Sequence, residues 1–303
     1  MKKNILIIGG TGFLGYHIAK ACLKLKWNVV SLSLNKPKKI RKLKRIKYII
    51  LNISIKKNLN KLNNYQFNYV INLGGYVNHT NSLEVKKYHY LGVKNLFEYF
   101  KKKKLESFIQ VGSSLEYGKS KIPHKENFKC KPLGIYGKNK FKASRFLLKK
   151  YLNHKFPVTI LRLYQVYGPS QDLNRFIPIL IQSSLRKIFF HSSNGVQKRD
   201  FLFVSDAVNA FLKTLSSKKS KGKIINIGYG KSVILKNIMN YVGRETKFFS
   251  PIYGKIKLRK DEYLDIYPEI KKAKKILNWK PKIHWKLGLS KTILYFKNFN
   301  AKR

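Results

Sequence analysis

Short apolar runs alternate with helical patterns along the first half of the chain. The apolar runs are Asn4–Ile8, Trp27–Leu34, Tyr48–Ile53, Tyr69–Leu73, Ser107–Gly112 and Val158–Leu163. Helical patterns separate several of them, at Tyr16–Lys26, Glu84–Lys104 and Tyr136–Tyr151. Continuous apolar runs suit strands that are buried on both faces, as in parallel sheets. The alternation therefore predicts an α/β protein with a Rossmann-like, doubly wound parallel sheet.

Glycines follow the first predicted strand at a regular spacing. In GGTGFLG they stand at Gly9, Gly12 and Gly15, between the apolar run and a helical pattern. This spacing permits a tight turn, a close approach of the backbone to a pyrophosphate and a phosphate site at the helix N-terminus. The motif predicts a dinucleotide-binding turn. The residues expected at the cofactor are Gly9, Gly12, Phe13, Leu14 and Gly15.

The second predicted strand ends without the acidic residue that would bind the adenosine ribose of NAD. Ser33 stands in its place and is followed by Asn35, Lys36, Lys38 and Lys39. Lysines here suit the extra phosphate of NADP, although an ordinary solvated face would also account for them. We expect NAD or NADP as the cofactor, with NADP slightly favoured.

The formal net charge of +52 makes nucleic acid or an anionic membrane a candidate partner. Lysine outnumbers arginine 55 to ten, however, and the lysines are spread over the whole sequence. Such a distribution is typical of compositional drift in an A/T-rich genome, so we do not expect nucleic acid to be the main partner. The positive field would still attract an anionic nucleotide substrate.

The sequence does not predict a metal site, a disulfide framework or a membrane span. Its two cysteines, Cys22 and Cys130, have no metal-like spacing, so we expect neither a bound metal nor a disulfide framework. No apolar run approaches the roughly 20 residues of a membrane span. The first predicted strand follows Met1 almost directly, without a cleavage site. A cytoplasmic location is the default expectation.

A serine, a tyrosine and a lysine carry the candidate chemistry. Tyr136 and Lys140 stand four apart at the start of a helical pattern, so they share one face, and Ser113 follows the strand-like run Ser107–Gly112. A phenol has a pKa of about 10 and transfers protons poorly at neutral pH unless a cation stabilises its anion. We expect Lys140, together with a bound nicotinamide, to lower the pKa of Tyr136.

Chance alone produces several Tyr-x-x-x-Lys pairs in a chain so rich in both residues. Such pairs also begin at Tyr16, Tyr99 and Tyr117. The pair at Tyr117 is followed by Pro123, which interrupts a helix. Tyr136 instead opens a long helical pattern, and a serine precedes it at a strand end. We therefore assign catalysis to Ser113, Tyr136 and Lys140.

These residues resemble the extended short-chain dehydrogenases/reductases that act on nucleotide sugars. In that family a serine or threonine lies four residues before the tyrosine of a strand-end Tyr-Gly pair, as Ser113 lies before Tyr117-Gly118. The family's Tyr-x-x-x-Lys follows about twenty residues later, where Tyr136 and Lys140 stand. The resemblance covers the whole chain.

The resemblance implies hydride transfer between nicotinamide and a sugar carbon, above all C4, of a nucleoside-diphosphate sugar. Tyr136 would move the hydroxyl proton, Lys140 would tune Tyr136 and orient the cofactor ribose, and Ser113 would bind the reacting oxygen. A homodimer and a role in surface-polysaccharide precursors are also implied. We expect an NAD(P)-binding domain at 1–165 and a smaller substrate lobe at 166–303, interleaved with it.

The resemblance also extends to the remaining binding residues. It places Leu73 and Gly74 at the cofactor, together with Tyr136 and Lys140. The expected substrate-binding residues are Ser113, Ser114, Gln165, Arg175, Arg199 and Arg259, and the arginines suit phosphate oxygens.

Several positions depart from the family pattern. Asn52 stands near the family's adenine-contacting Asp, and Gln165 replaces an Asn. His89 replaces the Asn that supports the active-site lysine through a water, which puts that support in doubt. His79 is either a substrate-facing or a surface histidine.

The two residues after Ser113 indicate which type of enzyme within the resembled family this chain is. The family's 4,6-dehydratases carry Asp-Glu there, whereas this chain has Ser114-Leu115, so a dehydratase is disfavoured. A nucleotide-sugar epimerase or 4-ketoreductase remains. The competing class is a non-catalytic, RNA-binding protein of the same fold.

Overall fold

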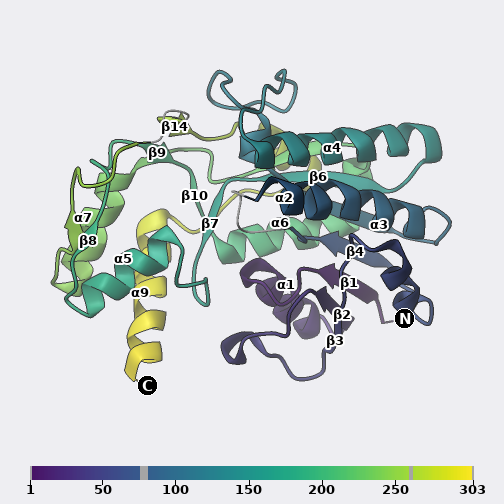
Figure 1. The fold of residues 1–303 in the computed structure, drawn as a ribbon, viewed down its shortest axis with the longest axis horizontal. Helices are drawn as coiled ribbons and strands as arrows, with labels where there is room; N and C mark the ends of the chain where they lie inside the picture. The colour runs from purple at the N-terminus through teal and green to yellow at the C-terminus, as the bar shows by residue number, and fades with distance from the viewer. Residues whose placement is uncertain (1, 76–80, 259–261, 302–303) are drawn as a thin grey trace.

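A parallel sheet forms the centre of the molecule (Figure 1). The computed structural model describes residues 2–75, 81–258 and 262–301. Within them a seven-stranded sheet has the order β11-β6-β5-β4-β1-β2-β3, with every neighbouring pair parallel. Its strands are β1 Asn4–Ile8, β2 Asn28–Ser33, β3 Lys47–Ile50, β4 Tyr69–Asn72, β5 Ser107–Ser113, β6 Val158–Leu163 and β11 Ile224–Ile227. The doubly wound sheet predicted from the sequence is confirmed.

Helices cover both faces of the sheet (Figure 1). One face carries α2 (Ser82–Lys86), α3 (Gly92–Phe100) and α4 (Ile135–His154), and the other carries α1 (Phe13–Lys24) and α6 (Val204–Ser216). Short 3-10 turns lie between these elements, at η1 Lys39–Arg41, η2 Lys56–Leu62, η4 Ser114–Glu116 and η5 Lys218–Ser220.

Each face of the sheet has its own hydrophobic core. Ile5 and Ile7 of β1 belong to the core that includes α1 and α6. Leu6 and Ile8 of the same strand belong to the core that includes α3 and α4. This division follows from the strand geometry, because successive side chains point to opposite faces. Burial on both faces explains why β1 is a continuous apolar run.

The predicted helix over residues 84–104 is interrupted in the structure. It consists of α2, a π-helical turn η3 (Lys87–Leu91) and α3, which ends at Phe100. A π-helical turn holds one more residue than an α-helical turn, and the apolar period of a sequence does not reveal it. The first helix also begins earlier than predicted, at Phe13, directly after the glycine turn.

The second half of the chain builds a smaller lobe beside the sheet (Figure 1). Its helices are α5 Phe176–Leu185, α7 Leu235–Thr246 and α9 Trp285–Ala301, whereas α8 Lys271–Leu277 packs against β11 and α6 beside the main sheet. Its short strands are β7 Gln165–Tyr167, β8 Phe190–His191, β9 Lys198–Arg199, β10 Phe201–Phe203, β12 Val233–Ile234, β13 Pro251–Ile252 and β14 Asp265–Ile266. The strand β11, in contrast, pairs with β6 and completes the main sheet. Residues 166–303 therefore contribute to the sheet as well as to the lobe.

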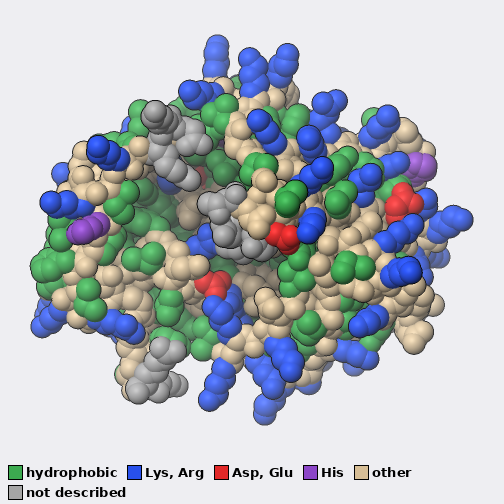
Figure 2. Space-filling view, viewed as in Figure 1, with side chains coloured by type: hydrophobic (Ala, Val, Ile, Leu, Met, Phe, Trp, Pro, Cys, Tyr) green, Lys and Arg blue, Asp and Glu red, His purple; other side chains and the backbone are tan. Residues whose placement is uncertain are grey.

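Basic side chains are distributed over the visible face of both parts of the molecule (Figure 2). Their scatter agrees with the even spread of lysines along the sequence. Among the described residues, no helix has the length and apolar character that a membrane span needs. No group of three or more His, Cys, Asp or Glu side chains suited to a metal ion occurs in that part of the chain either.

Candidate active site

The glycine turn is shaped for close contacts between backbone atoms. Gly9 has a φ of +76°, and its N–H donates to the carbonyl of Leu32 at 2.7 Å. A Cβ on Gly15 would lie 2.4 Å from the carbonyl oxygen of Gly9. A side chain at Gly15 would therefore push the start of α1 away from β1, so the tight turn needs glycine here.

A cavity of about 260 Å³ opens at the carboxyl ends of β1, β2 and β4. It is lined by half of the residues predicted to bind the cofactor, namely Gly9, Gly12, Ser33, Leu73 and Gly74. Phe13, Leu14 and Gly15 form the first turn of α1, whose N–H groups have no carbonyl partner within the helix. Those donors suit a pyrophosphate, so the residues present fit a dinucleotide.

The polar groups around Ser33 and Asn52 are held by neighbouring protein groups. The Ser33 hydroxyl accepts a hydrogen bond from the Thr11 N–H at 3.2 Å. The Asn52 side chain accepts from the Ser54 N–H at 2.8 Å and donates to the Tyr88 hydroxyl at 3.1 Å. Tyr88 also lines the cofactor cavity, and no motif in the sequence indicated this role.

Two of the cations near Ser33 are engaged by a residue of the second half of the chain. Arg41 donates to both carboxylate oxygens of Asp172, at 3.1 and 2.7 Å. The Lys38 ammonium also binds this carboxylate, at 2.7 Å. The sequence did not reveal these contacts, because the partners lie more than a hundred residues apart in the chain.

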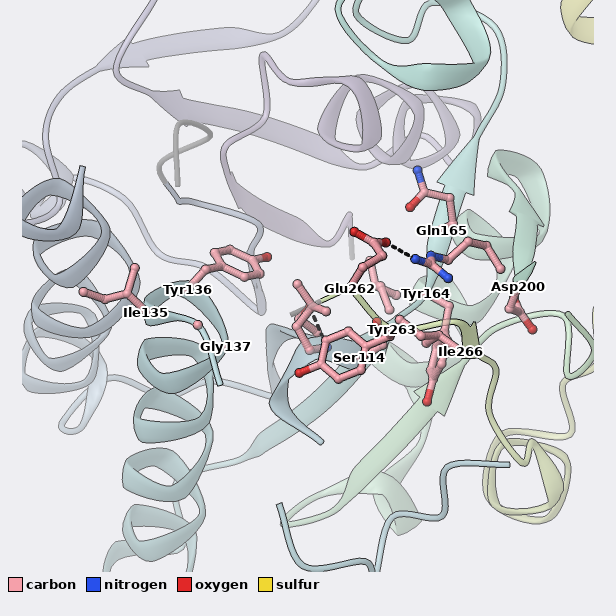
Figure 3. Close-up of a pocket in the computed structure, with 15 residues that line it drawn as sticks. Ser114, Ile135, Tyr136, Gly137, Tyr164, Gln165, Asp200, Glu262, Tyr263 and Ile266 are labelled. Atoms are coloured by element: carbon pink, nitrogen blue, oxygen red, sulfur yellow. Dashed lines mark hydrogen bonds and ion pairs between the residues drawn. The ribbon is translucent and has the colours of Figure 1, made fainter. Parts of the chain in front are cut away.

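A second cavity, of about 480 Å³, lies between the sheet and the lobe. Its lining includes five predicted site residues: Ser113, Ser114, Tyr136, Gln165 and Arg199. Figure 3 shows the Tyr136 ring projecting from α4, with Gln165 and Glu262 on the opposite side. Lys140 and Arg175 do not belong to the lining. Arg259 and His79 lie outside the described residues.

The start of α4 places Tyr136 and Lys140 on one face, as predicted. The ammonium of Lys140 lies 5.8 Å from the centroid of the Tyr136 ring and donates to the carbonyl of Val111 at 3.0 Å. Val111 and Ser113 both belong to β5. The Ser113 hydroxyl accepts from the Leu115 N–H at 3.2 Å and also interacts with the phenol of Tyr136. The three predicted catalytic residues therefore lie together.

In the protein alone, the pKa of Tyr136 is raised above that of a free phenol. Burial of the phenol raises it to about 12, because a phenolate loses its hydration there, and the hydrogen bond with Ser113 only partly opposes this effect. Burial lowers the pKa of Lys140 to about 8, and the nearby Glu116 carboxylate opposes that shift. Our expectation concerned Lys140 together with a bound nicotinamide, so for the complex with cofactor it stays a prediction.

A buried ion pair between Glu116 and Arg162 contacts the backbone of Ser113. The Glu116 carboxylate accepts from the Ser113 N–H at 2.8 Å and from Nε and Nη2 of Arg162 at 3.1 and 3.0 Å. The Glu116 and Arg162 side chains are 0% and 1% exposed. The Ser-x-x-Glu spacing is that of a capping box and would have pointed to Glu116.

Tyr117 belongs to the supporting structure and not to the cavity. It is fully buried, and its hydroxyl donates to the Asn226 side chain at 2.7 Å. The guanidinium of Arg162 lies 4.4 Å from the centroid of its ring. This environment agrees with our exclusion of the Tyr117–Lys121 pair as the catalytic one.

Charged residues close the lobe side of the cavity. Arg199 and Glu262 form an ion pair, and Arg199 also donates to the carbonyl of Lys198 at 2.8 Å. Arg175 immediately precedes α5, and its positive charge acts to lower the pKa of Tyr136. Glu262 further lines a mostly apolar cavity of about 440 Å³, with Phe176, Phe190, Leu235, Met239 and Leu258 among its other lining residues.

Known proteins resemble this chain in sequence and in fold. The model of the NAD dependent epimerase/dehydratase family matches residues 5–228. A putative UDP-glucose 4-epimerase of Methanocaldococcus jannaschii is 30% identical over 313 residues, covering 98% of this chain and 99% of its own.

Two solved structures show the same fold over nearly the whole chain. The UDP-glucose 4-epimerase of Thermotoga maritima, solved with UDP-glucose, has a TM-score of 0.92 at 23% identity. The UDP-glucuronic acid 4-epimerase of Bacillus cereus, solved with UDP-glucuronic acid and NAD, has a TM-score of 0.87 at 24% identity. Each likeness covers 98% of this chain and 99% of the other.

Proposed function

Since this chain belongs to the NAD dependent epimerase/dehydratase family, we propose that it is a nucleotide-sugar 4-epimerase that uses Ser113, Tyr136 and Lys140. The observation that carries the proposal is that these three residues lie together beside the cavity between the sheet and the lobe. Tyr136 lines that cavity, and Lys140 and Ser113 both contact Tyr136. The nicotinamide supplies the hydride chemistry when it is bound.

The proton at the sugar hydroxyl is the part of the reaction that the chain itself handles. As the phenolate, Tyr136 would accept the proton of the C4 hydroxyl when C4 is oxidised, and would return it when C4 is reduced again on its opposite face. Ser113 holds the C4 oxygen by a hydrogen bond. Lys140 keeps a positive charge beside the phenol, and this charge favours the phenolate while the proton is away.

The shape and charge of the lobe support a nucleoside-diphosphate sugar, and we propose a UDP-sugar. Arg199 offers a guanidinium that suits phosphate oxygens, and the apolar cavity beside Glu262 suits a base. The M. jannaschii relative and both solved structures are named for UDP-sugar epimerases. Ser114-Leu115 supplies no acid for removing water, so a 4,6-dehydratase is disfavoured.

A 4-ketoreductase that consumes NADPH is the second candidate. Ser33 has no negative charge to repel the 2′-phosphate of NADP, and lysines follow it. Because Lys38 and Arg41 form ion pairs with Asp172, less positive charge is available to bind that phosphate. We propose NAD or NADP as the cofactor, with NADP slightly favoured, and the dissociation constants of the two cofactors test this.

We also propose a homodimer, in keeping with the family resemblance. The resemblance implies contacts through the helices near residues 84–104 and 136–151, and on these helices Leu83 of α2 and Leu152 of α4 are 69% and 68% exposed. Light scattering of the purified protein measures the assembly directly. A mass equal to one chain at micromolar concentration would contradict the dimer.

The test of function measures whether the protein inverts the configuration at C4 of the sugar. The protein is incubated with NAD and, in separate samples, UDP-glucose, UDP-galactose and UDP-glucuronic acid, and the C4 epimers are quantified by proton NMR. We expect interconversion of one pair, abolished by Tyr136→Phe. Steady NADPH consumption with a 4-keto nucleotide sugar would favour the reductase. Salt-sensitive RNA retention without any turnover would favour the non-catalytic class.

A further inference from the structure

A histidine contacts the phenol that we assign to catalysis. His89 is 4% exposed, and its ring centroid lies 5.0 Å from that of Tyr136, with the rings at 88°. Edge-to-face geometry of this kind is one of the two arrangements that pairs of aromatic rings favour. The imidazole therefore touches the side chain that moves the proton.

The backbone brings His89 to this place by a local departure from the α-helix. His89 is the middle residue of the π-helical turn η3, between α2 and α3, and η3 packs against α4. A π-helical turn changes the face on which the following residues lie, and single turns of this kind are frequent at functional sites. The turn thus directs a buried histidine toward α4, the helix that carries Tyr136.

Gly75 provides the space that the imidazole occupies. A Cβ on Gly75 would lie 2.0 Å from Cε1 and 2.7 Å from Nδ1 of His89. Gly75 also lines the cofactor cavity, just beyond β4. The imidazole therefore lies between the backbone of the cofactor cavity and the ring of Tyr136.

We propose that His89 is a positioning residue for Tyr136. Its ring fixes the plane of the phenol, so that the hydroxyl meets Ser113 and the C4 oxygen of the sugar. Its contact with Gly75 fixes that plane relative to the cofactor. The inference rests on the proposed role of Tyr136. It predicts that removal of the ring slows turnover and leaves substrate affinity unchanged.

The kinetic test compares three variants. His89→Ala removes the ring, and we expect kcat to fall about tenfold because a misplaced group reacts slowly, with KM within about twofold of wild type. His89→Phe keeps an aromatic ring, and we expect its kcat within about threefold of wild type. His154→Ala, a control at an exposed histidine whose ring also contacts a phenylalanine, leaves both constants unchanged. A kcat as low in His89→Phe as in His89→Ala, or no loss in His89→Ala, would overturn the inference.

An NMR test separates this inference from the proposed function. In protein with ring-labelled tyrosine, the Tyr136 signal is identified by its disappearance in Tyr136→Phe. We expect His89→Ala to shift this signal, because the ring current of the imidazole is lost, and His154→Ala to leave it in place. An unshifted signal overturns the contact. Absence of turnover in the wild type, with the signal shifted as expected, overturns only the function.

Discussion

At the scale of residues, Tyr136 and Lys140 are both withdrawn from water at the start of α4. Their pKa values move in opposite directions, to about 12 and about 8, because burial disfavours the charged form of each. Lys140 therefore holds its proton less firmly than in water. The proton of Tyr136, in contrast, is held more firmly than in water. Formation of the phenolate therefore needs a further positive charge.

The ionisation of Tyr136 can be followed directly. In the protein alone we expect no Tyr136 phenolate below about pH 10, since burial favours the neutral phenol. Addition of NAD brings the nicotinamide cation and should lower this pKa. The measurement is the ultraviolet phenolate absorbance of the wild type minus that of Tyr136→Phe, titrated with and without NAD. A phenolate at neutral pH without NAD would contradict the expectation.

The buried pair of Glu116 and Arg162 predicts a large loss of stability. Glu116→Ala leaves the Arg162 guanidinium buried without its carboxylate, and the free energy of unfolding should fall by about 3–5 kcal/mol. The matched control is Glu98→Ala, which breaks the partly exposed pair between Glu98 of α3 and Lys101, the residue after α3, and should cost about 0.3–0.5 kcal/mol. Urea unfolding measures both. Equal losses in the two variants would show that the buried pair contributes little.

At the scale of elements, the turn between β1 and α1 holds its shape because it has no side chains at its closest approaches. We expect Gly15→Ala to weaken NAD binding at least about tenfold, since its Cβ would meet the Gly9 carbonyl and displace the N-terminus of α1. The control is Gly134→Ala, where a Cβ would have nothing within 4 Å. Isothermal titration with NAD measures both. An unchanged affinity in Gly15→Ala would show that the turn tolerates a Cβ.

Most strands of the sheet could be predicted because burial on both faces leaves continuous apolar runs. The glycine turn and the Ser113, Tyr136 and Lys140 set were likewise visible as local spacings. Long-range polar contacts were not, because Asp172 approaches Arg41 only after the lobe has folded onto the sheet. The π-helical turn at His89 was also missed, since a residue inserted into a helix leaves no separate mark in the apolar period.

At the scale of the whole molecule, the spread of positive charge predicts a dependence of binding on salt. An anionic nucleotide sugar is drawn to a basic surface over distances of about one Debye length, near 10 Å at 0.1 M salt. We expect kcat/KM to fall several-fold between about 50 and 500 mM salt, with kcat nearly constant. Initial rates at a series of salt concentrations measure this. A kcat/KM independent of salt would show that the surface charge does not assist the encounter.

The pairing of β11 with β6 has a consequence for how the chain folds during synthesis. The strand β6 ends at Leu163, but its neighbour on that side begins only at Ile224. On the ribosome, one border of the growing sheet therefore stays open while some sixty further residues are made. Unpaired strand borders invite association with other chains. This interval is where a nascent chain is most exposed to aggregation and where chaperone protection would be most useful.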